Sequence, residues 1–323
     1  MKRTIRSSAW AMTLLALSIA AAGCNDSPKW KNDVTAALTK QAEVKQYAFT
    51  GEADLNVGLP APAADSNAAT AVLVSMFSTG KIAWSGLSST DPLRMEAEYK
   101  LTPGGSSASF TLPVIFKDNL IYMSIPLLNK PGEYFSFNLA GSGGAAESQA
   151  ASDAGSLKNV NQAMSDSVKQ LVGDFDPKWF KKDKKTAQLK DGGEATVIRV
   201  PVTEKNKDAV TEKLQAKLPA VLDGWKASGI LTAAQAGGLK AGVAGSWRVT
   251  GGELAFTLDQ AGFVRQETVN IDYRTAAEAD RHVHYTQSYD GINQPPAFKK
   301  DTPKSVRPFA EVLQLLQTQK GGK

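Results

Sequence analysis

The two histidines of this 323-residue chain, His282 and His284, are its clearest candidates for chemistry. They stand two positions apart in a segment whose alternating pattern predicts a β-strand, so both side chains would share one face with Asp280. Two imidazole nitrogens beside a carboxylate could bind a metal such as zinc. In the alternative, which we favour, this face is polar and solvent-facing, and the intervening residues point inward: Arg281, Val283 and Tyr285. We therefore predict no metal and no cofactor.

Motifs for catalysis are absent from the sequence. Hydrolytic chemistry requires a nucleophile held beside a base. The spacings HExxH, GxSxG and GxxxxGK(S/T) do not occur, and the glycines at positions 141, 143 and 144 lie in a low-complexity segment instead of a phosphate-binding turn. We predict that the protein is not an enzyme, and an envelope hydrolase without a recognised motif is the least favoured possibility.

The single cysteine, Cys24, ends an apolar stretch near the start of the chain. Basic residues in "MKRTIRSS" precede "AWAMTLLALSIAAA", and Gly23 stands directly before the cysteine. This arrangement resembles the lipobox of bacterial lipoproteins, although Ala21 occupies a position where leucine is usual. The resemblance implies a diacylglycerol thioether on Cys24 and cleavage just before it. The alternative is an ordinary secretory signal with an incidental cysteine, but a lone unmodified cysteine is unusual in an exported protein.

The lipobox resemblance divides the chain into a signal peptide (1–23), a lipidated tether (24–28) and a single domain (29–323). Three of the basic residues leave with the signal, so a formal charge of +5 becomes +2, which gives no argument for nucleic-acid binding. No later apolar run is long enough to span a bilayer. We therefore expect an extracytoplasmic protein anchored by lipid at the outer face of a Gram-positive cytoplasmic membrane.

Hydrophobic periodicity predicts an α+β domain. Apolar residues at helical spacing indicate a first helix over about 30–44, and alternation begins at "YAFTGEADLNV" and continues through a meander of strands to about 138. The pair Asp118-Asn119 predicts a hairpin turn. A flexible low-complexity loop (140–155) is followed by a helical insertion (156–245), within which 195–203 reads as a strand, and then by further strands and a proline-containing tail.

This order of elements resembles the lipoprotein-carrier superfamily, which includes periplasmic lipoprotein-localisation factors and lipid-carrier lipoproteins of actinobacteria. The stretches that carry the resemblance are "VKQYAFTGEADLNV" and "HVHYTQSYDGINQPPAFKKDTP". It implies a large curved antiparallel sheet, a half-open barrel, packed against several helices with an apolar gap that holds acyl chains. The helical insertion makes this chain longer than a minimal carrier, which leaves open whether the gap is open or filled.

If the gap is open, large apolar side chains of the strands would line it. Adaptable methionines and aromatic rings suit acyl chains of variable shape. The predicted ligand-binding residues are Phe49, Met76, Phe77, Trp84, Met95, Phe116, Tyr122 and Met123. If the gap is filled, the same residues form an ordinary core.

A basic segment with aromatic residues is a candidate membrane-surface contact. Its residues are Lys178, Trp179, Phe180, Lys181 and Lys182. Lysines near an anionic lipid surface contribute about 1 kcal/mol each. The alternative, which we favour, is a solvated turn whose two aromatic rings pack inward.

Taken together, the sequence predicts a lipid-anchored, non-enzymatic protein that binds a lipid or another apolar ligand between sheet and helices. Its expected partners are the membrane, through Cys24, and a lipid ligand. No nucleic acid and no specific protein partner are predicted. The alternative is a structural or protein-interaction lipoprotein of the envelope without a ligand cavity.

Overall fold

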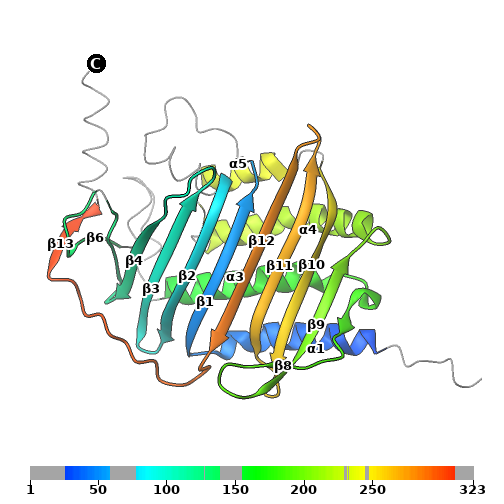
Figure 1. The fold of residues 1–323 in the computed structure, drawn as a ribbon, viewed down its shortest axis with the longest axis horizontal. Coiled ribbons are helices and arrows are strands. Elements are labelled where there is room, and N and C mark those ends of the chain that lie inside the picture. Colours follow the sequence, from blue (N-terminus) through cyan, green and yellow to red (C-terminus); the bar gives the residue numbers. More distant parts are fainter. Residues whose placement is uncertain are drawn as a thin grey trace, which may run out of the picture.

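The computed structural model describes residues 26–58, 78–126, 128–138, 155–228, 231, 233–243 and 247–309. Strands from almost the whole described length join one open sheet, with the helices layered on one side of it (Figure 1). Several predictions fall outside the described residues: those for Cys24, Met76 and Phe77, and for the loop at 140–154.

The sheet contains 13 strands, and every neighbouring pair is antiparallel except β13 and β6. β1 lies between β2 and β12, so the first long strand pairs with the last. In spatial order the strands are β13 (Ser305–Pro308), β6 (Glu133–Asn138), β5 (Leu120–Met123), β4 (Phe110–Lys117), β3 (Leu93–Pro103), β2 (Thr79–Thr90), β1 (Gln46–Asn56), β12 (Asp280–Asp290), β11 (Val264–Thr275), β10 (Trp247–Asp259), β9 (Glu194–Val202) and β7 (Lys181–Lys182), with β8 (Ala187–Gln188) also on β9.

The helical elements of the described chain are α1 (Ser27–Lys40), η1 (Gln41–Glu43), α3 (Gly155–Gly173), η3 (Pro177–Trp179), α4 (Lys207–Ala227) and α5 (Ala233–Val243). The predicted α+β class with a large antiparallel sheet and several helices is confirmed. Residues 156–245, predicted as a helical insertion, hold α3 from its second residue together with η3, α4 and α5, and also β7, β8 and β9, which belong to the common sheet. None of the helices in the described part of the chain combines the length and apolar character needed to cross a membrane.

Strand register assigns each side chain to one of two faces. Residues directly opposite on paired strands point the same way, and alternate residues along a strand point in opposite directions. Phe256 on β10 is paired with Ile198 on β9, and both lie in the core shared with α1, α3 and α4. We call the face that carries this pair the inner face and the opposite one the outer face.

The hydrophobic core lies at the β9–β10 end of the inner face. Phe256, Ile198 and Val200 are fully buried there, as are Val34 of α1 and Val210 of α4. The helical spacing of apolar residues in α1 and α4 directs one side of each helix to the sheet, and burial of that side stabilises both layers. α4 contacts β10 extensively, so the helices are fixed mainly to this end of the sheet.

A two-residue turn joins β4 and β5 of the meander. Asp118 and Asn119 have φ values of 54° and 61° between β4 and β5. Positive φ at both central residues is typical of a type I′ hairpin turn, and Asp and Asn tolerate it better than most residues. The hairpin predicted from this pair is confirmed.

Candidate ligand-binding face

The inner face continues from the core across β12, β1 and β2 to β5, and most predicted ligand-binding residues lie on it. Met95 is paired with Phe116, and Met123 is paired with the inward-pointing Val114. Phe49 and Trp84 belong to the same face through their positions on β1 and β2. The register therefore brings together five residues that the sequence distributes over 75 positions.

Tyr122 lies on the other face of the sheet. It is paired with Ile115, which points outward because its neighbour Val114 points inward. Its side chain is 5 % exposed, so it is buried on the outer face instead of lining the gap. The prediction of Tyr122 as a ligand-binding residue is therefore corrected, since one position along a strand reverses the direction of a side chain.

A tryptophan spans three strands at the centre of this face. Trp84 on β2 donates a hydrogen bond from its indole Nε1 to Oε1 of Gln287 on β12, 2.6 Å away. The ring crosses Gly51 of the intervening β1, where an added Cβ would lie 2.4 Å from the indole. Glycine is therefore required at this position, because any larger residue would displace the ring.

A second glycine, Gly86 on β2, likewise lies beneath an aromatic ring of the inner face. Phe49 lies against Gly86, where an added Cβ would be 2.5 Å from the phenyl ring. Each row of residues across the strands has its own aromatic contact: the ring centroids of Tyr47 and Tyr289 are 5.5 Å apart, and those of Trp84 and Tyr285 are 5.8 Å apart. The centre of the inner face thus carries two groups of aromatic rings.

A carboxyl group lies within this aromatic surface. Glu267 on β11 is opposite Gln287 on β12 and opposite Phe256 on β10, which places it on the inner face. It is 9 % exposed and accepts a hydrogen bond from the Tyr285 hydroxyl at 3.2 Å. Burial raises the pKa of the Glu267 carboxyl to about 7.

Sequence analysis missed Glu267, although a signal was present. Val269 and Ile271 follow it at a spacing of two and point inward with it. An acidic residue that shares the parity of buried apolar residues in a strand is unusual, because burial of an unpaired carboxylate is costly.

The histidines take the solvent-facing orientation favoured from the sequence. His282 and His284 point outward from β12, and Val283 and Tyr285 point inward. Each imidazole Nε2 contacts a different carboxylate, Asp54 at 3.3 Å for His282 and Asp272 at 2.9 Å for His284, and the two rings stack at 4.7 Å. Within the described residues, no group of three or more His, Cys, Asp or Glu side chains is arranged to hold a metal.

The basic segment is divided by burial. Phe180 is fully buried in the core, and the Trp179 ring packs on Phe175 with centroids 5.4 Å apart. The predicted membrane contact of these two aromatic residues is therefore wrong, because their apolar rings contribute to the core. The lysines of the segment remain exposed: Lys178, Lys181 and Lys182. Lys182 also lies 5.3 Å from the ring of Trp30 in α1.

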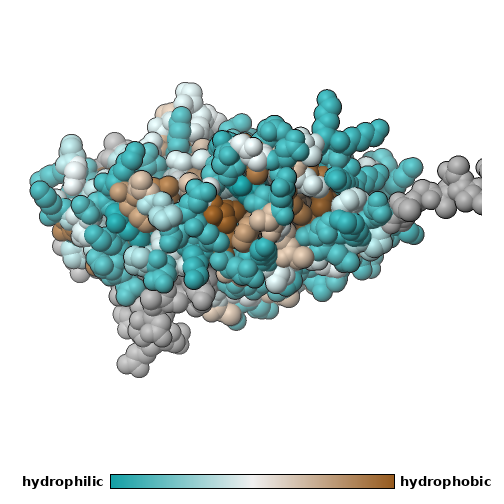
Figure 2. All heavy atoms as spheres, turned by 90° about the horizontal axis from the view of Figure 1, so that it is seen from below, coloured by the Kyte–Doolittle hydropathy of each residue, from teal (hydrophilic) through white to brown (hydrophobic). Residues whose placement is uncertain are grey.

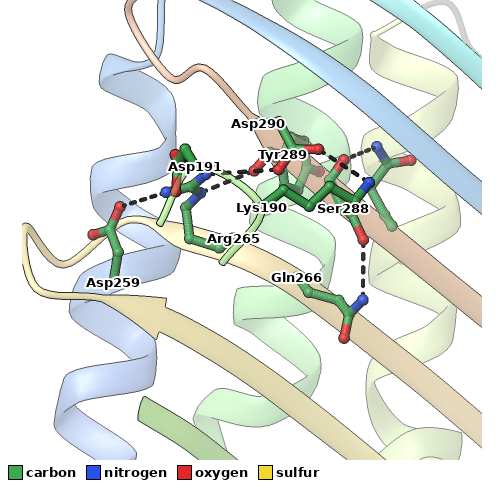
Figure 3. Close-up of polar contacts among 9 residues, drawn as sticks. Lys190, Asp191, Asp259, Arg265, Gln266, Ser288, Tyr289 and Asp290 are labelled. Atoms are coloured by element: carbon green, nitrogen blue, oxygen red, sulfur yellow. Dashed lines mark hydrogen bonds and ion pairs between the residues drawn. The ribbon is translucent and has the colours of Figure 1, made fainter. Parts of the chain in front are cut away.

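One buried arginine joins strand ends and a turn at one edge of the candidate face, which we call its lower rim. Figure 3 shows Arg265 between Asp191, Asp259 and Asp290. Its guanidinium lies 2.6 Å from Asp191, 3.6 Å from Asp259 and 3.7 Å from Asp290, and Nε donates to the Tyr289 carbonyl at 2.9 Å. This cluster ties the turn between β8 and β9 to the ends of β10 and β12, two residues from Glu267.

One groove among the described residues lies away from the predicted gap. It has a volume of ≈ 330 Å³ and lies between α3 and α4. Its lining is mostly polar or small: Gln162, Ala163, Asp166, Ser167, Gln170, Val221, Gly224, Ala227 and Ser228. Since the sheet contributes no lining residue, this groove is not the gap expected between sheet and helices.

Comparisons with known proteins add little beyond the architecture. No family model matches the chain, and no curated protein is significantly similar in sequence. Among solved structures, the crystal structure of LprF from Mycobacterium bovis is similar over 84 % of this chain and 97 % of that chain, with a TM-score of 0.39 and 10 % identity. These values do not assign the chain to a family.

Proposed function

We propose that this chain is a lipid-anchored extracytoplasmic protein that binds a lipid or other apolar ligand on the inner face of its sheet, without catalysis. The observation that supports the proposal is a difference in burial along that face. At the β9–β10 end, Phe256 and Ile198 are fully buried under the helices. Towards the β2–β5 end the burial is mixed: Phe116 and Phe49 are buried, whereas Trp84, Met95 and Met123 keep part of their surface accessible.

The surface of the molecule agrees with such an opening. Seen from below, apolar atoms gather along the middle of the molecule between hydrophilic rims (Figure 2). An acyl chain placed there would gain about 0.8 kcal/mol for each methylene removed from water. Methionine and flat aromatic side chains would adapt to different chains without large conformational change.

The anchor would set the orientation on the membrane. Cys24 stands two residues before Asp26, at the start of the described chain, so it can lie no more than about 7 Å from Asp26. α1 begins there, beside exposed lysines of the basic segment. We place this corner against the outer face of a Gram-positive cytoplasmic membrane, where anionic lipid would attract the lysines.

Ligand binding is tested on protein made with Cys24→Ser, which removes the anchor's own lipid, and purified without detergent. We expect a bound lipid by native mass spectrometry and saturable binding of N-phenyl-1-naphthylamine. Met95→Lys introduces a charge on the inner face and should weaken binding at least tenfold. Glu98→Lys, on the same strand but on the outer face, is the matched control. Protein that carries no lipid and binds no probe would contradict the proposal.

The anchor is tested in a bacterial host. Wild-type protein should fractionate with membranes and carry a lipid mass on Cys24, whereas Cys24→Ser should appear in the soluble fraction. A Cys24→Ser protein that stays on the membrane would exclude the lipid anchor as the attachment.

A further inference from the structure

Glu267 has a hydrogen-bonding deficit that the fold itself does not satisfy. Tyr285 is its one hydrogen-bond donor among the described residues, and no lysine, arginine or histidine pairs with it there. Arg265 is two positions away, but its guanidinium is engaged by Asp191 and by the Tyr289 carbonyl. A carboxyl group buried without a cation is costly unless it is neutral or receives hydrogen bonds.

The hydroxyl group of Tyr289 is a second polar group on this part of the inner face. Tyr289 lies two residues after Gln287, the residue paired with Glu267, so Tyr289 and Glu267 point to the inner face from neighbouring strands. The Tyr289 hydroxyl makes no hydrogen bond within the described residues. The fully enclosed, unpaired polar side-chain atoms of the described chain belong to Arg94 and Asn129. Neither the second carboxyl oxygen of Glu267 nor the Tyr289 hydroxyl belongs to that set of enclosed, unpaired atoms.

The neighbouring amide of Gln287 is held by two hydrogen bonds. Gln287 accepts from Trp84 through Oε1 and donates to the Ser288 carbonyl through Nε2. This arrangement holds the amide in place beside Glu267 and Tyr289, on a face that also carries Tyr47 and Tyr99. Glu267 and Tyr289 both lie near the lower ends of their strands, beside the Arg265 cluster, whereas the apolar side chains extend away across β1 to β5.

We propose that Glu267 and Tyr289 form a polar subsite that binds the uncharged, hydroxyl-bearing end of an amphipathic ligand whose acyl chain lies along the aromatic surface. A ligand hydroxyl can donate to the free oxygen of Glu267 and exchange a hydrogen bond with Tyr289. This inference rests on the proposed function, because it specifies which end of an apolar ligand is recognised.

The surrounding charges favour a neutral head group over an anionic one. No cation in the described residues pairs with Glu267, so a carboxylate or phosphate would meet a like charge without compensation. Burial, which raises the pKa of Glu267 to about 7, also allows the neutral acid to donate a hydrogen bond near neutral pH. Both forms of the carboxyl group can bind a hydroxyl group.

The test compares three amphiphiles with one acyl chain: 1-oleoylglycerol, methyl oleate and oleate. Each amphiphile is titrated into the Cys24→Ser protein loaded with N-phenyl-1-naphthylamine at pH 8, and displacement of the probe gives its affinity. We expect 1-oleoylglycerol to bind about tenfold more tightly than methyl oleate, the equivalent of one to two hydrogen bonds, and oleate to bind most weakly. Glu267→Leu should remove the preference for 1-oleoylglycerol, and Tyr289→Phe should reduce it about threefold.

Controls separate a lost subsite from a lost fold. Glu52→Leu makes the same substitution at an exposed position on the outer face of β1 and should keep the wild-type preference. Glu267→Gln serves if the leucine variant does not fold, since it keeps the size and should lower the preference at least threefold. Equal affinities for all three amphiphiles in the wild type, or an unchanged preference in Glu267→Leu, would overturn the subsite. Failure of every amphiphile to bind would instead reject the proposed function.

Discussion

Trp84 and Gln287 are hydrogen-bonded although their strands are not neighbours. The indole Nε1 and the amide Oε1 are 2.6 Å apart because the ring lies flat over Gly51 of the strand between them. One contact therefore fixes the relative positions of β2, β1 and β12 on the inner face. It also holds the Gln287 amide beside Glu267, the residue with which Gln287 is paired on β11.

Gly51→Ala should disturb this arrangement. The added Cβ would lie 2.4 Å from the indole, so the ring must move and the bond to Gln287 is lost. We expect a loss of about 1–3 kcal/mol in the free energy of unfolding, measured by urea denaturation, and a shift in tryptophan fluorescence. Gly251→Ala is the control, because a Cβ there meets no atom within 4 Å. Equal effects of the two substitutions would refute the role of the close contact.

The stability of the fold should fall as the pH rises through the range of Glu267. Its pKa is raised from 4.5 to about 7 by burial, so the folded state holds a proton that the unfolded state releases between these values. The free energy of unfolding should therefore decrease from about pH 4.5 to pH 7, by as much as about 3 kcal/mol from this group. The two tyrosines nearest to it, Tyr285 and Tyr289, stay neutral in this range because burial raises the pKa of each hydroxyl.

Glu267→Gln isolates this contribution. The difference between the wild-type and variant unfolding free energies, measured from pH 4 to pH 8, should show the decrease, because glutamine does not titrate. Glu52→Gln on the exposed outer face should leave the wild-type profile unchanged. If the Glu267→Gln profile runs parallel to the wild type, the carboxyl group is not buried as described.

Arg265→Met should destabilise the lower rim. Its side chain is 7 % exposed and balances three carboxylates, which would repel one another without it. Removing one partner from a buried ionic cluster costs about 3–5 kcal/mol. Hydrogen exchange should also become faster in the turn around Asp191. Arg248→Met, an exposed partner of Glu278, should cost less than about 1 kcal/mol, and a similar cost for both variants would argue against the cluster.

Substitutions at the two ends of the inner face should separate stability from binding. Phe256→Ala removes a fully buried ring from the helix-covered end and should cost about 3–5 kcal/mol. Met123→Ala removes a partly accessible side chain, so we expect a smaller cost, about 1 kcal/mol, but a clear loss of probe affinity. Urea denaturation and N-phenyl-1-naphthylamine titration measure the two effects. A Met123→Ala variant with normal probe affinity would place the ligand elsewhere.

Local patterns in the sequence determined the elements and several orientations. The spacing of apolar residues predicted α1, α4 and the strands, since helix and strand periodicity arise from backbone geometry. The pair Asp118-Asn119 determined a hairpin because positive φ is tolerated there. Alternation was also sufficient to predict that His282 and His284 point away from the inward-facing Tyr285.

Only the tertiary structure decided which residues meet. Tyr122 and Met123 are equally plausible ligand contacts by type, but strand register sends them to opposite faces. The burial of Phe180 depends on helices distant in the chain, and β13 joins β6 as a parallel strand that no local signal indicated. The approach of Glu267 to Tyr285 and of Trp84 to Gln287 likewise depends on pairing between strands far apart in sequence. Periodicity is a property of each segment, whereas contacts across the inner face are set by the register of the whole sheet.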